Sequence, residues 1–341
     1  MADYININGN NIPIRASDPT NPIVGEIWYN LTTNELKGQG ATTTGSFSTG
    51  GSMSNARAQV NGGIGTKAAT IAAGLTSTDG TSEEYDGTSW SGGGSLNNAA
   101  TVGIGAGTLS AGSRFGGIQP TPLGKDSNYH EQYDGTSWTT ATGMPFDSYN
   151  NASGGTQGAN IVIQSFFNPT PSTSGFPTAT AEWNGSWTSG GSINTARREA
   201  FSSQGGGSQI STFIAGGGAP GSPKNNSETY DGTCWTSTAN MNTARSRGGG
   251  GGTATNGIII TGTTLDPQIP GLTTATESWN GTSWTTNPFS VSTATWNGGS
   301  AVTSDESGII FGGNYAPGAA FAGSEELSGP GLPITVTISS S

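Results

Sequence analysis

The sequence predicts an all-β fold made of six similar units closed into a ring, a six-bladed β-propeller. An aromatic residue recurs after gaps of 43, 48, 49, 48 and 49 residues, at Phe47, Trp90, Trp138, Trp187, Trp235 and Trp284. A Tyr-Asp-Gly-Thr-Ser-Trp motif, or a close variant of it, ends at each of the five tryptophans. A period of about 40–50 residues, with only short strands between turn signals, is typical of a propeller.

The composition alone would suggest disorder, because 58 of the 341 residues are glycine and only 31% are hydrophobic. Against this, the chain has 28 aromatic residues (Trp 9, Tyr 8, Phe 11), and many of them keep the period of the repeat. A disordered tract has no reason to hold tryptophan in register. We therefore expect a packed array in which neighbouring units supply each other's core.

One unit, residues 188–235, shows how four strands fit into a repeat. The first three strands are expected near Glu199–Ser203, at Thr212–Ala215 and at Ser227–Tyr230, and a fourth begins at Cys234. Asp231-Gly232 predicts a tight hairpin turn before the last strand, because glycine accepts positive φ. Four strands per unit make a propeller blade.

Two further motifs recur with the period of the repeat. A glycine pair follows the second strand, at Gly116-Gly117, Gly216-Gly217 and Gly312-Gly313. A Met-x-x-Ala-Arg stretch opens units, as Met53–Arg57, Ile193–Arg197 and Met241–Arg245. With these motifs the repeat resembles the kelch family. The resemblance covers about residues 45–329 and implies a kelch-like propeller; the unit at 139–187 departs from it most, because it has no glycine pair.

The sixth unit lacks a tryptophan after its third strand, so another segment has to supply its outer strand. Phe47 lies in a segment, residues 44–50, that suits this position, and we expect it to close the ring. The alternative is that Pro333–Ile338 supplies the strand. The predicted organisation is an anchoring arm and hairpin (1–43), the propeller (44–329) and a C-terminal strand or tail (330–341).

Several functional classes are disfavoured by composition. The net charge of −11 argues against a nucleic-acid partner, which needs a basic face. A single cysteine excludes a disulfide within the chain, and no Cys/His cluster predicts a metal or other cofactor. No apolar run approaches about 18 residues, and the N-terminus lacks a basic region followed by an apolar one, so neither membrane insertion nor a signal peptide is expected.

The loops between second and third strands should all emerge on one face of the ring. They contain ten of the 17 prolines and vary between units, whereas the Asp-Gly turns on the opposite face are short. Variable loops on a rigid scaffold are where binding usually occurs, although long loops also simply tolerate insertions. The candidate contact residues are Asp126, Tyr129, His130, Phe167, Phe176, Asn225, Asp266, Tyr315 and Phe321.

Recurring charged residues are expected to be structural. Five Asp or Asn residues spread round a ring cannot meet at one site, so turn formation explains them. The glutamates Glu83, Glu131, Glu228 and Glu277 also recur, and the repeat arginines Arg57, Arg197 and Arg245 are expected to bridge blades. Outside the pattern, Arg114, Arg198 and Arg247 are expected to be solvated, and His130 to be a surface or loop residue.

The residues argue against an enzyme. Copper radical oxidases share the kelch architecture but need two histidine ligands, and this chain has one histidine. Sialidase Asp boxes have one more residue between Asp and Trp, and those enzymes also need an arginine triad. A glycosidase needs two acids about 5–9.5 Å apart, whereas the glutamates recur with the repeat. A glycosidase stays as the least favoured alternative.

The first 43 residues carry a second resemblance. Gly25-Glu26-Ile27-Trp28-Tyr29-Asn30, a turn, and Glu35-Leu36-Lys37-Gly38 form a predicted hairpin after a proline-punctuated extended segment. The hairpin looks like an element common in virion proteins of tailed bacteriophages, particularly those of marine cyanobacteria.

This resemblance implies a virion structural protein at the particle surface, associated with the tail or its fibres. The arm would dock on other virion proteins by strand addition, through Ile14, Trp28, Tyr29 and Leu36. The alternative is that the arm packs on its own propeller beside Pro333–Ile338. The propeller would recognise a host-surface glycan or protein. Alternatively, it would brace the capsid as a decoration protein.

Overall fold

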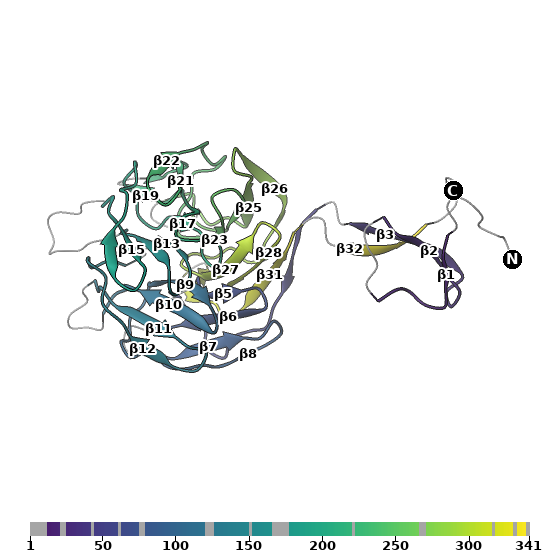
Figure 1. Ribbon diagram of the computed structural model, residues 1–341, viewed down its shortest axis with the longest axis horizontal. Coiled ribbons are helices and arrows are strands. Elements are labelled where there is room, and N and C mark those ends of the chain that lie inside the picture. Colours follow the sequence, from purple (N-terminus) through teal and green to yellow (C-terminus); the bar gives the residue numbers. More distant parts are fainter. Residues whose placement is uncertain are drawn as a thin grey trace. The chain divides into compact units, whose positions relative to one another are not determined.

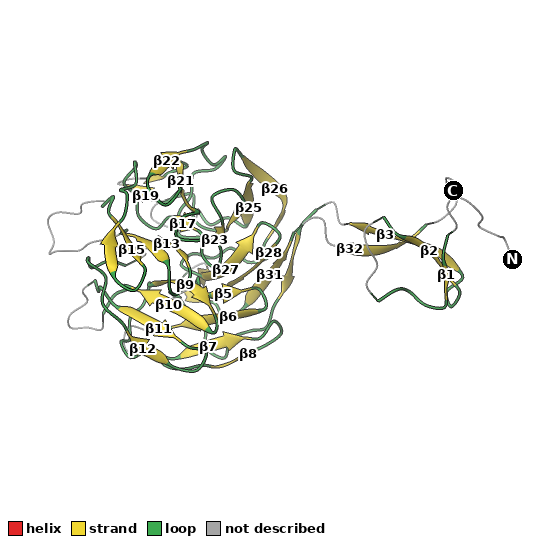
Figure 2. Cartoon of the chain, viewed as in Figure 1, coloured by secondary structure: helices red, strands yellow, loops and turns green. Residues whose placement is uncertain are grey.

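The computed structural model describes residues 12–20, 25–41, 44–60, 63–74, 79–119, 126–149, 152–165, 177–219, 222–265, 271–315, 318–329 and 333–338. The chain forms two compact units. Phe47–Leu327 is the propeller, and Met1–Ser46 with Ser328–Ser341 form the second, which we call the end unit. The described residues form strands and loops, and among them no helix is long and apolar enough to cross a membrane (Figure 2).

The propeller consists of six four-stranded antiparallel sheets, and each sheet is one blade (Figure 1). From the innermost strand outward, blade 1 consists of β5 (Gly65–Thr66), β6 (Ala69–Ala73), β7 (Ser82–Tyr85) and β8 (Trp90–Gly92). Blade 2 consists of β9 (Ile104–Thr108), β10 (Ala111–Phe115), β11 (His130–Tyr133) and β12 (Trp138–Thr140). Blade 3 consists of β13 (Ala152–Gly155), β14 (Asn160–Ile163), β15 (Thr180–Trp183) and β16 (Trp187–Ser189).

Blades 4 and 5 continue the same order, and blade 6 takes its outer strand from the start of the propeller. Blade 4 consists of β17 (Phe201–Ser202), β18 (Thr212–Ala215), β21 (Ser227–Tyr230) and β22 (Trp235–Ser237). Blade 5 consists of β23 (Gly249–Gly252), β24 (Gly257–Ile260), β25 (Ala275–Trp279) and β26 (Trp284–Ser290). Blade 6 consists of β27 (Gly299–Ser304), β28 (Ser307–Phe311), β31 (Ser324–Ser328) and β4 (Ser46–Thr49). Two small hairpins, β19 (Gly218–Ala219) with β20 (Ser222–Pro223) and β29 (Asn314–Tyr315) with β30 (Ala319–Ala320), lie between second and third strands.

The ring closes where blade 6 meets blade 1. The innermost strands of neighbouring blades contact one another round the ring, including β27 with β5. The fourth strand of blade 6 is β4, so the segment around Phe47 fills the position for which the sequence favoured it, and Pro333–Thr337 belongs to another sheet. A six-bladed kelch-like propeller therefore follows from the repeat, as predicted.

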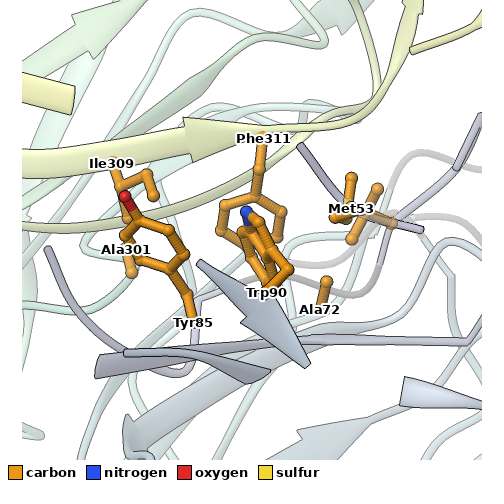
Figure 3. Packing of buried hydrophobic residues seen from close by; sticks show 8 residues of the cluster. Met53, Ala72, Tyr85, Trp90, Ala301, Ile309 and Phe311 are labelled. Atoms are coloured by element: carbon orange, nitrogen blue, oxygen red, sulfur yellow. The ribbon is translucent and has the colours of Figure 1, made fainter. Parts of the chain in front are cut away.

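Each blade packs on the next through aromatic and aliphatic side chains. Tyr85 and Trp90 face each other across β7 and β8, with ring centroids 5.1 Å apart, and Trp90 lies 5.1 Å from Phe311 of blade 6 in an edge-on contact (Figure 3). Six such clusters occupy the six junctions between blades. Truncating one buried tryptophan to alanine typically costs about 3–5 kcal/mol, which explains why the repeat keeps it.

Hydrogen bonds reinforce the same junctions. The Trp138 Nε1–H donates to the carbonyl of Gly94, which follows the outer strand of blade 1, at 3.0 Å. The Tyr230 hydroxyl donates to Glu182 of blade 3 at 2.6 Å. At the closure of the ring, the equivalent bond joins Tyr85 to Glu326. The blades are therefore joined by directional contacts as well as by apolar packing.

The end unit is a single sheet in the order β1 (Ile14–Arg15), β2 (Ile27–Asn30), β3 (Glu35–Ala41) and β32 (Pro333–Thr337). β1 pairs in parallel with β2, and the other neighbours are antiparallel. The hairpin and its Leu31–Asn34 turn match the sequence prediction, and Asn34 has the positive φ of 56° that such a turn needs. Both ends of the chain therefore build one sheet.

Docking through Trp28 would need an exposed side chain, and that expectation is wrong. Its side chain is fully buried, and its Nε1–H donates to Asp18 Oδ1 at 2.9 Å. Asp18 also accepts hydrogen bonds from Lys37 and Asn30, and these contacts, the one from Lys37 first, lower its pKa to about 2. The proline-punctuated segment thus folds back on the hairpin and covers the tryptophan, which makes Trp28 a core residue of the end unit.

Candidate functional site

One face of the propeller carries both the links between blades and the loops between second and third strands; we call it the loop face. The two kinds of segment pair there. Thr101, in the link to blade 2, bridges Ile118 in that blade's loop, and Ser246 bridges Thr263 in blade 5. The Asp-Gly turns lie on the opposite side of the blades, because strand direction alternates. The described links and loops of this face thus lie around the mouth of the central channel.

Four residues at this mouth share an uncommon backbone conformation. Each lies two residues before the innermost strand of its blade and has a φ between 51° and 62°: Val102, Glu199, Arg247 and Asn297. Left-handed backbone is disfavoured for residues with a side chain and is a genuine outlier for a β-branched one such as valine. Such strain tends to concentrate where a protein binds or reacts.

These residues also connect the blades through their main chains. The Arg247 N–H donates to the Glu199 carbonyl at 3.0 Å, and the Asn297 N–H donates to the Arg247 carbonyl at 2.8 Å. The Val60 N–H continues the series, donating to the Asn297 carbonyl at 3.2 Å. A chain of hydrogen bonds therefore follows the rim from blade 4 to blade 1, and it fixes the positions of the side chains that project from it.

The turn after β17 reaches across the channel and fills it. The Gly205 N–H donates to the Gly63 carbonyl in blade 1 at 3.1 Å, and the Val302 N–H in blade 6 donates to the Gln204 carbonyl at 3.0 Å. Gly205 has a φ of 76°, and a Cβ there would lie 2.6 Å from the Val302 nitrogen, so only glycine fits. The channel is thus closed by backbone rather than open throughout.

A cavity of about 50 Å³ remains at the mouth. Its polar lining residues are Gln204, Glu199, Arg247 and Asn297, and its apolar ones include Val60, Val102 and Ile104. A water molecule needs about 10–15 Å³ of such volume, so the cavity has room for several waters or for a small chemical group.

The charges of this site are largely withdrawn from solvent. Arg247 Nε lies 2.6 Å from Glu199 Oε2, and Arg198 Nε lies 3.7 Å from the same oxygen. The side chains of Glu199, Arg247 and Arg198 are 5%, 13% and 20% exposed. The prediction that both arginines are solvated is therefore wrong: each pairs with a glutamate that the sequence did not single out.

Tyr149 belongs to the same electrostatic neighbourhood. Burial, followed by the charges of Asp126 and Glu199, raises the pKa of Tyr149 to about 12, while Arg198 and Arg247 oppose that rise. The phenol is therefore neutral at physiological pH, and its hydroxyl carries a proton that it can donate. Asp126, a predicted contact residue, is only 6% exposed and is not among the residues that line the cavity.

The other predicted contact residues do not converge on one site. Tyr315 and Phe321 lie together in blade 6, with rings 5.9 Å apart, and Tyr315 is 39% exposed. The Arg114 guanidinium lies over the ring of Tyr129, and its Cζ is 5.9 Å from the centroid of that ring. Asn225 donates to the Met241 carbonyl at 3.2 Å. Phe167, Phe176 and Asp266 are outside the described residues.

His130 is a core residue, and its predicted surface position is wrong. It opens β11, where other blades have Ser82, Ser227 or Thr276, and it is 1% exposed. Its Nδ1 lies 3.1 Å from the Thr142 carbonyl. In the other blades, a serine or threonine hydroxyl at this position donates to the corresponding carbonyl. Burial lowers the pKa of His130 to about 4, so the imidazole is neutral at physiological pH.

Arg114 is also buried, with no exposed surface, which contradicts its predicted solvation. Its Nη2 lies 3.4 Å from the carbonyl of Ala100, the residue at the position of the repeat arginine in the link to blade 2. Burial lowers the pKa of Arg114 to about 10, and the charge of Glu131 opposes this fall. A cation on β10 therefore lies near the place of the arginine that the link lacks, although Arg114 Nε and Nη1 and Glu131 Oε2 have no hydrogen-bond partner.

The repeated charged residues have structural roles, as predicted, but the prediction that the repeat arginines bridge blades is wrong, because each of their side chains bonds within the blade that follows its link. Arg197 Nη2 lies 2.6 Å from Glu228 Oε1, and the same oxygen accepts the Thr195 N–H at 3.0 Å. In the turns, Asp231 Oδ1 accepts the N–H groups of Thr233 and Cys234 at 2.8 and 2.9 Å. Within the described part of the chain, no three His, Cys, Asp or Glu side chains gather as a metal site would require.

Comparison with known proteins supports the fold. No protein-family model matches the chain, and no curated protein does either. Among solved structures, that of YjhT is similar to this chain with a TM-score of 0.63 and 16% sequence identity. The match covers 80% of this chain and 95% of the YjhT chain. At this identity the likeness concerns the architecture and not the function.

Proposed function

We propose that the protein is a non-enzymatic structural component of a bacteriophage virion, associated with the tail or its fibres. In this proposal the end unit docks on other virion proteins, and the propeller presents its loop face to a glycan on the host surface. The observation that carries the proposal is the division of the chain into a propeller and a separate small sheet built from both chain ends. An anchor and a recognition head are two tasks that such a division suits.

The end unit has surface features that suit docking. Its exposed apolar side chains include Ile14 at 68%, Leu31 at 51% and Val336 at 40%. Ile14 is on β1 and Val336 on β32, the two outer strands of the sheet, and outer strands can accept a further strand from a partner. The half-buried Tyr29 lies between them on β2. The buried Trp28 and Leu36 support the sheet from inside rather than the contact itself.

The location is tested by immunogold electron microscopy of intact particles with antibody against the propeller. Label at the tail tip or fibres supports the proposal. Label over the head would instead make the protein a capsid decoration protein, and particles without label would remove the virion assignment.

The docking role is tested by incorporation of full-length variants into particles. Ile14→Asp and Val336→Asp should each reduce the amount of protein per particle, because each places a charge on an outer strand of the end unit. The matched control is Ile210→Asp, which changes an equally exposed isoleucine, 63% accessible, on a turn of the propeller. Equal incorporation of all three variants would contradict docking through the end unit.

A further inference from the structure

We infer that the mouth of the central channel binds the acidic end of a ligand, a carboxylate or sulfate group, with Arg247 as its direct partner and Arg198 as a second positive charge. The inference rests on the proposed function only for the source of that ligand, a charged sugar of a surface glycan. It concerns the cavity lined by Glu199, Gln204, Arg247 and Asn297.

Few side chains of this protein carry a positive charge. Among the described basic residues of the propeller that are not buried within blades, half lie at the channel mouth. The chain has 11 Lys and Arg residues against 22 Asp and Glu. Four arginines are fully or almost fully buried within blades: Arg57, Arg114, Arg197 and Arg245. The other basic residues that the structure describes in the propeller are Lys67, Arg198, Lys224 and Arg247, and two of these four are at the mouth.

The local charge favours an anion. Arg198 and Arg247 share the carboxylate of Glu199, so these three groups together carry one excess positive charge. The fourth charge of this neighbourhood, that of Asp126, is 6% exposed and does not line the cavity, so an anion in the cavity meets Arg247 and not Asp126. A guanidinium has five N–H donors, so it can bind two oxyanions at the same time. The apolar walls at Val60, Val102 and Ile104 lower the local dielectric constant, which strengthens the attraction between Arg247 and an incoming anion.

The size and stiffness of the cavity suit an end group rather than a whole sugar. About 50 Å³ accommodates a carboxylate or sulfate, while the ring that carries it would lie outside, on the loop face. The rim is held by hydrogen bonds from blade 4 to blade 1 at left-handed residues, so the site is formed before the ligand arrives. A preformed site loses little conformational entropy on binding.

The competing explanation is that the two arginines only neutralise Glu199. Ligand binding separates the two explanations, because a purely structural ion pair would give no preference for an acidic ligand. Methyl glucuronide and methyl glucoside are suitable probes, since they differ chiefly in one carboxylate. Inorganic sulfate is a third probe, and it distinguishes recognition of the acidic group from recognition of the sugar.

The experiment is ligand-observed NMR and calorimetric titration of the full-length protein with these three probes. Methyl glucuronide and sulfate should bind and methyl glucoside should not, and rising salt should weaken binding. Arg247→Gln should weaken binding about 10- to 100-fold, as expected for loss of a charged hydrogen bond, and Arg198→Gln should weaken it less. The control Lys67→Gln removes a cation at Glu326, where the side chains lie 3.4 Å apart, and should leave affinity unchanged.

Three results would overturn the inference: equal binding of glucoside and glucuronide, no binding of any acidic probe, or binding that neither arginine variant weakens. Thermal unfolding of each variant shows whether Arg247→Gln is folded, and Arg198→Gln provides a second test if it is not. Immunogold labelling of particles tests the virion role separately. Labelled tails together with an empty channel mouth would reject this inference and leave the proposed location intact.

Discussion

Blade 5 and blade 2 hold the same buried glutamate by different means. In blade 5, Arg245 reaches from the preceding link, and its Nη2 lies 2.9 Å from Glu277 Oε1. The carboxylate also accepts the N–H groups of Asn242 and Thr243 at 2.7 and 3.1 Å, and Arg245 Nη1 donates to the Ala275 carbonyl at 2.6 Å. The charge and most of the donors are thus satisfied within one compact network.

In blade 2 the link has Ala100 where blade 5 has Arg245, and the cation comes from another strand. Arg114 on β10 faces Glu131 in the register, at the position that Ile259 occupies opposite Glu277 in blade 5. Glu131 Oε1 accepts two hydrogen bonds from Asn98, at 2.9 and 2.8 Å. The comparison teaches that the cation near this glutamate can come from the link or from β10. Blade 6 shows that a blade can also do without it: Glu325 is buried and accepts the N–H groups of Ser292 and Thr293, while the link has Thr295 where blade 5 has Arg245.

Blade 3 lacks both the carboxylate and the cation. It has Ala181 where blades 2 and 5 have their glutamates, opposite Val162 on β14, and Ser148 in the link. The carboxylate and the cation are therefore missing together. Losing both partners leaves no isolated ion in the interior, where such an ion is costly.

The largest expected effect comes from breaking the network of blade 5. Arg245→Met should destabilise the protein by about 3–5 kcal/mol, because it leaves the Glu277 carboxylate buried without its cation. The measurement is urea unfolding of the full-length chain followed by tryptophan fluorescence. The control variant Arg245→Met/Glu277→Gln removes both charges and should recover part of the loss; a single variant as stable as wild type would refute the role of this pair.

Acid sensitivity should come from blade 2, through His130. Burial holds its pKa at about 4, below the ordinary 6.5, so the unfolded chain takes up this proton first as the pH falls. The contribution of neutral His130 to the free energy of unfolding is therefore complete above pH 6.5. It is lost as the pH falls from 6.5 to 4, which lowers the free energy of unfolding by about 3 kcal/mol. Blade 5 has Thr276 at this position.

The test is the slope of unfolding free energy against pH for wild type and His130→Thr. The variant should lose this part of the slope, whatever its stability at pH 7, because threonine does not titrate there. A slope equal to that of wild type between pH 6.5 and 4 would show that His130 is not the group responsible.

Removing the cation of blade 2 should cost less than removing that of blade 5. Two nitrogens of Arg114, Nε and Nη1, have no hydrogen-bond partner, so its burial is poorly compensated. We expect Arg114→Met to cost about 1–2 kcal/mol in the same urea assay, because a side chain of similar volume fills the space. A cost equal to that of Arg245→Met would contradict the comparison.

A double exchange sharpens this point. Ala100→Arg with Arg114→Ile would rebuild in blade 2 the arrangement of blade 5, with the cation on the link and an aliphatic residue opposite the glutamate. The double variant should be more stable than Arg114→Ile alone. If it is not, the position of the cation depends on more than the location of the carboxylate.

The repeat made the fold predictable, because each strand and turn is specified several times. Asp-Gly turns, paired aromatics and the closing strand at Phe47 are local or periodic signals, and the structure has them where the sequence indicates. The sequence did not predict that His130 and Arg114 are buried, because each is a residue type that the other units lack at that position. The groups that accommodate each of them lie on a neighbouring strand. Trp28 was missed because Asp18 covers it from outside the hairpin.

The channel mouth was the least predictable part. Glu199, Arg247 and Asn297 belong to different blades and meet only when the ring closes. Their left-handed backbone conformation is not accompanied by a shared type of side chain that the sequence could reveal. Asn297-Gly298 is the one local signal, because asparagine tolerates positive φ better than most residues. Aligning the units would have placed these residues at the same repeat position, two after Arg197, Arg245 or the Thr295 that replaces the arginine, and so on one rim.

The smallest effect is expected in the exposed turns, where blade 2 uses Asp134 and blade 5 uses Asn280. Asp134 Oδ1 accepts the N–H groups of Thr136 and Ser137 at 2.9 and 2.8 Å, and Asn280 accepts the equivalent pair, both at 2.9 Å. Because both side chains offer the same oxygen, Asp134→Asn and Asn280→Asp should leave the thermal midpoint near neutral pH almost unchanged.

The two exchanges should differ only in acid. The N–H groups of Ser137 and Thr136 lower the pKa of Asp134, so its turn loses stability as the pH falls through that lowered pKa. Asp134→Asn should therefore flatten the acid limb of stability against pH, and Asn280→Asp should steepen it. Since the same exchange is neutral for packing in both blades, a large change in midpoint near neutral pH would mean that these turns carry a contact beyond their own backbone.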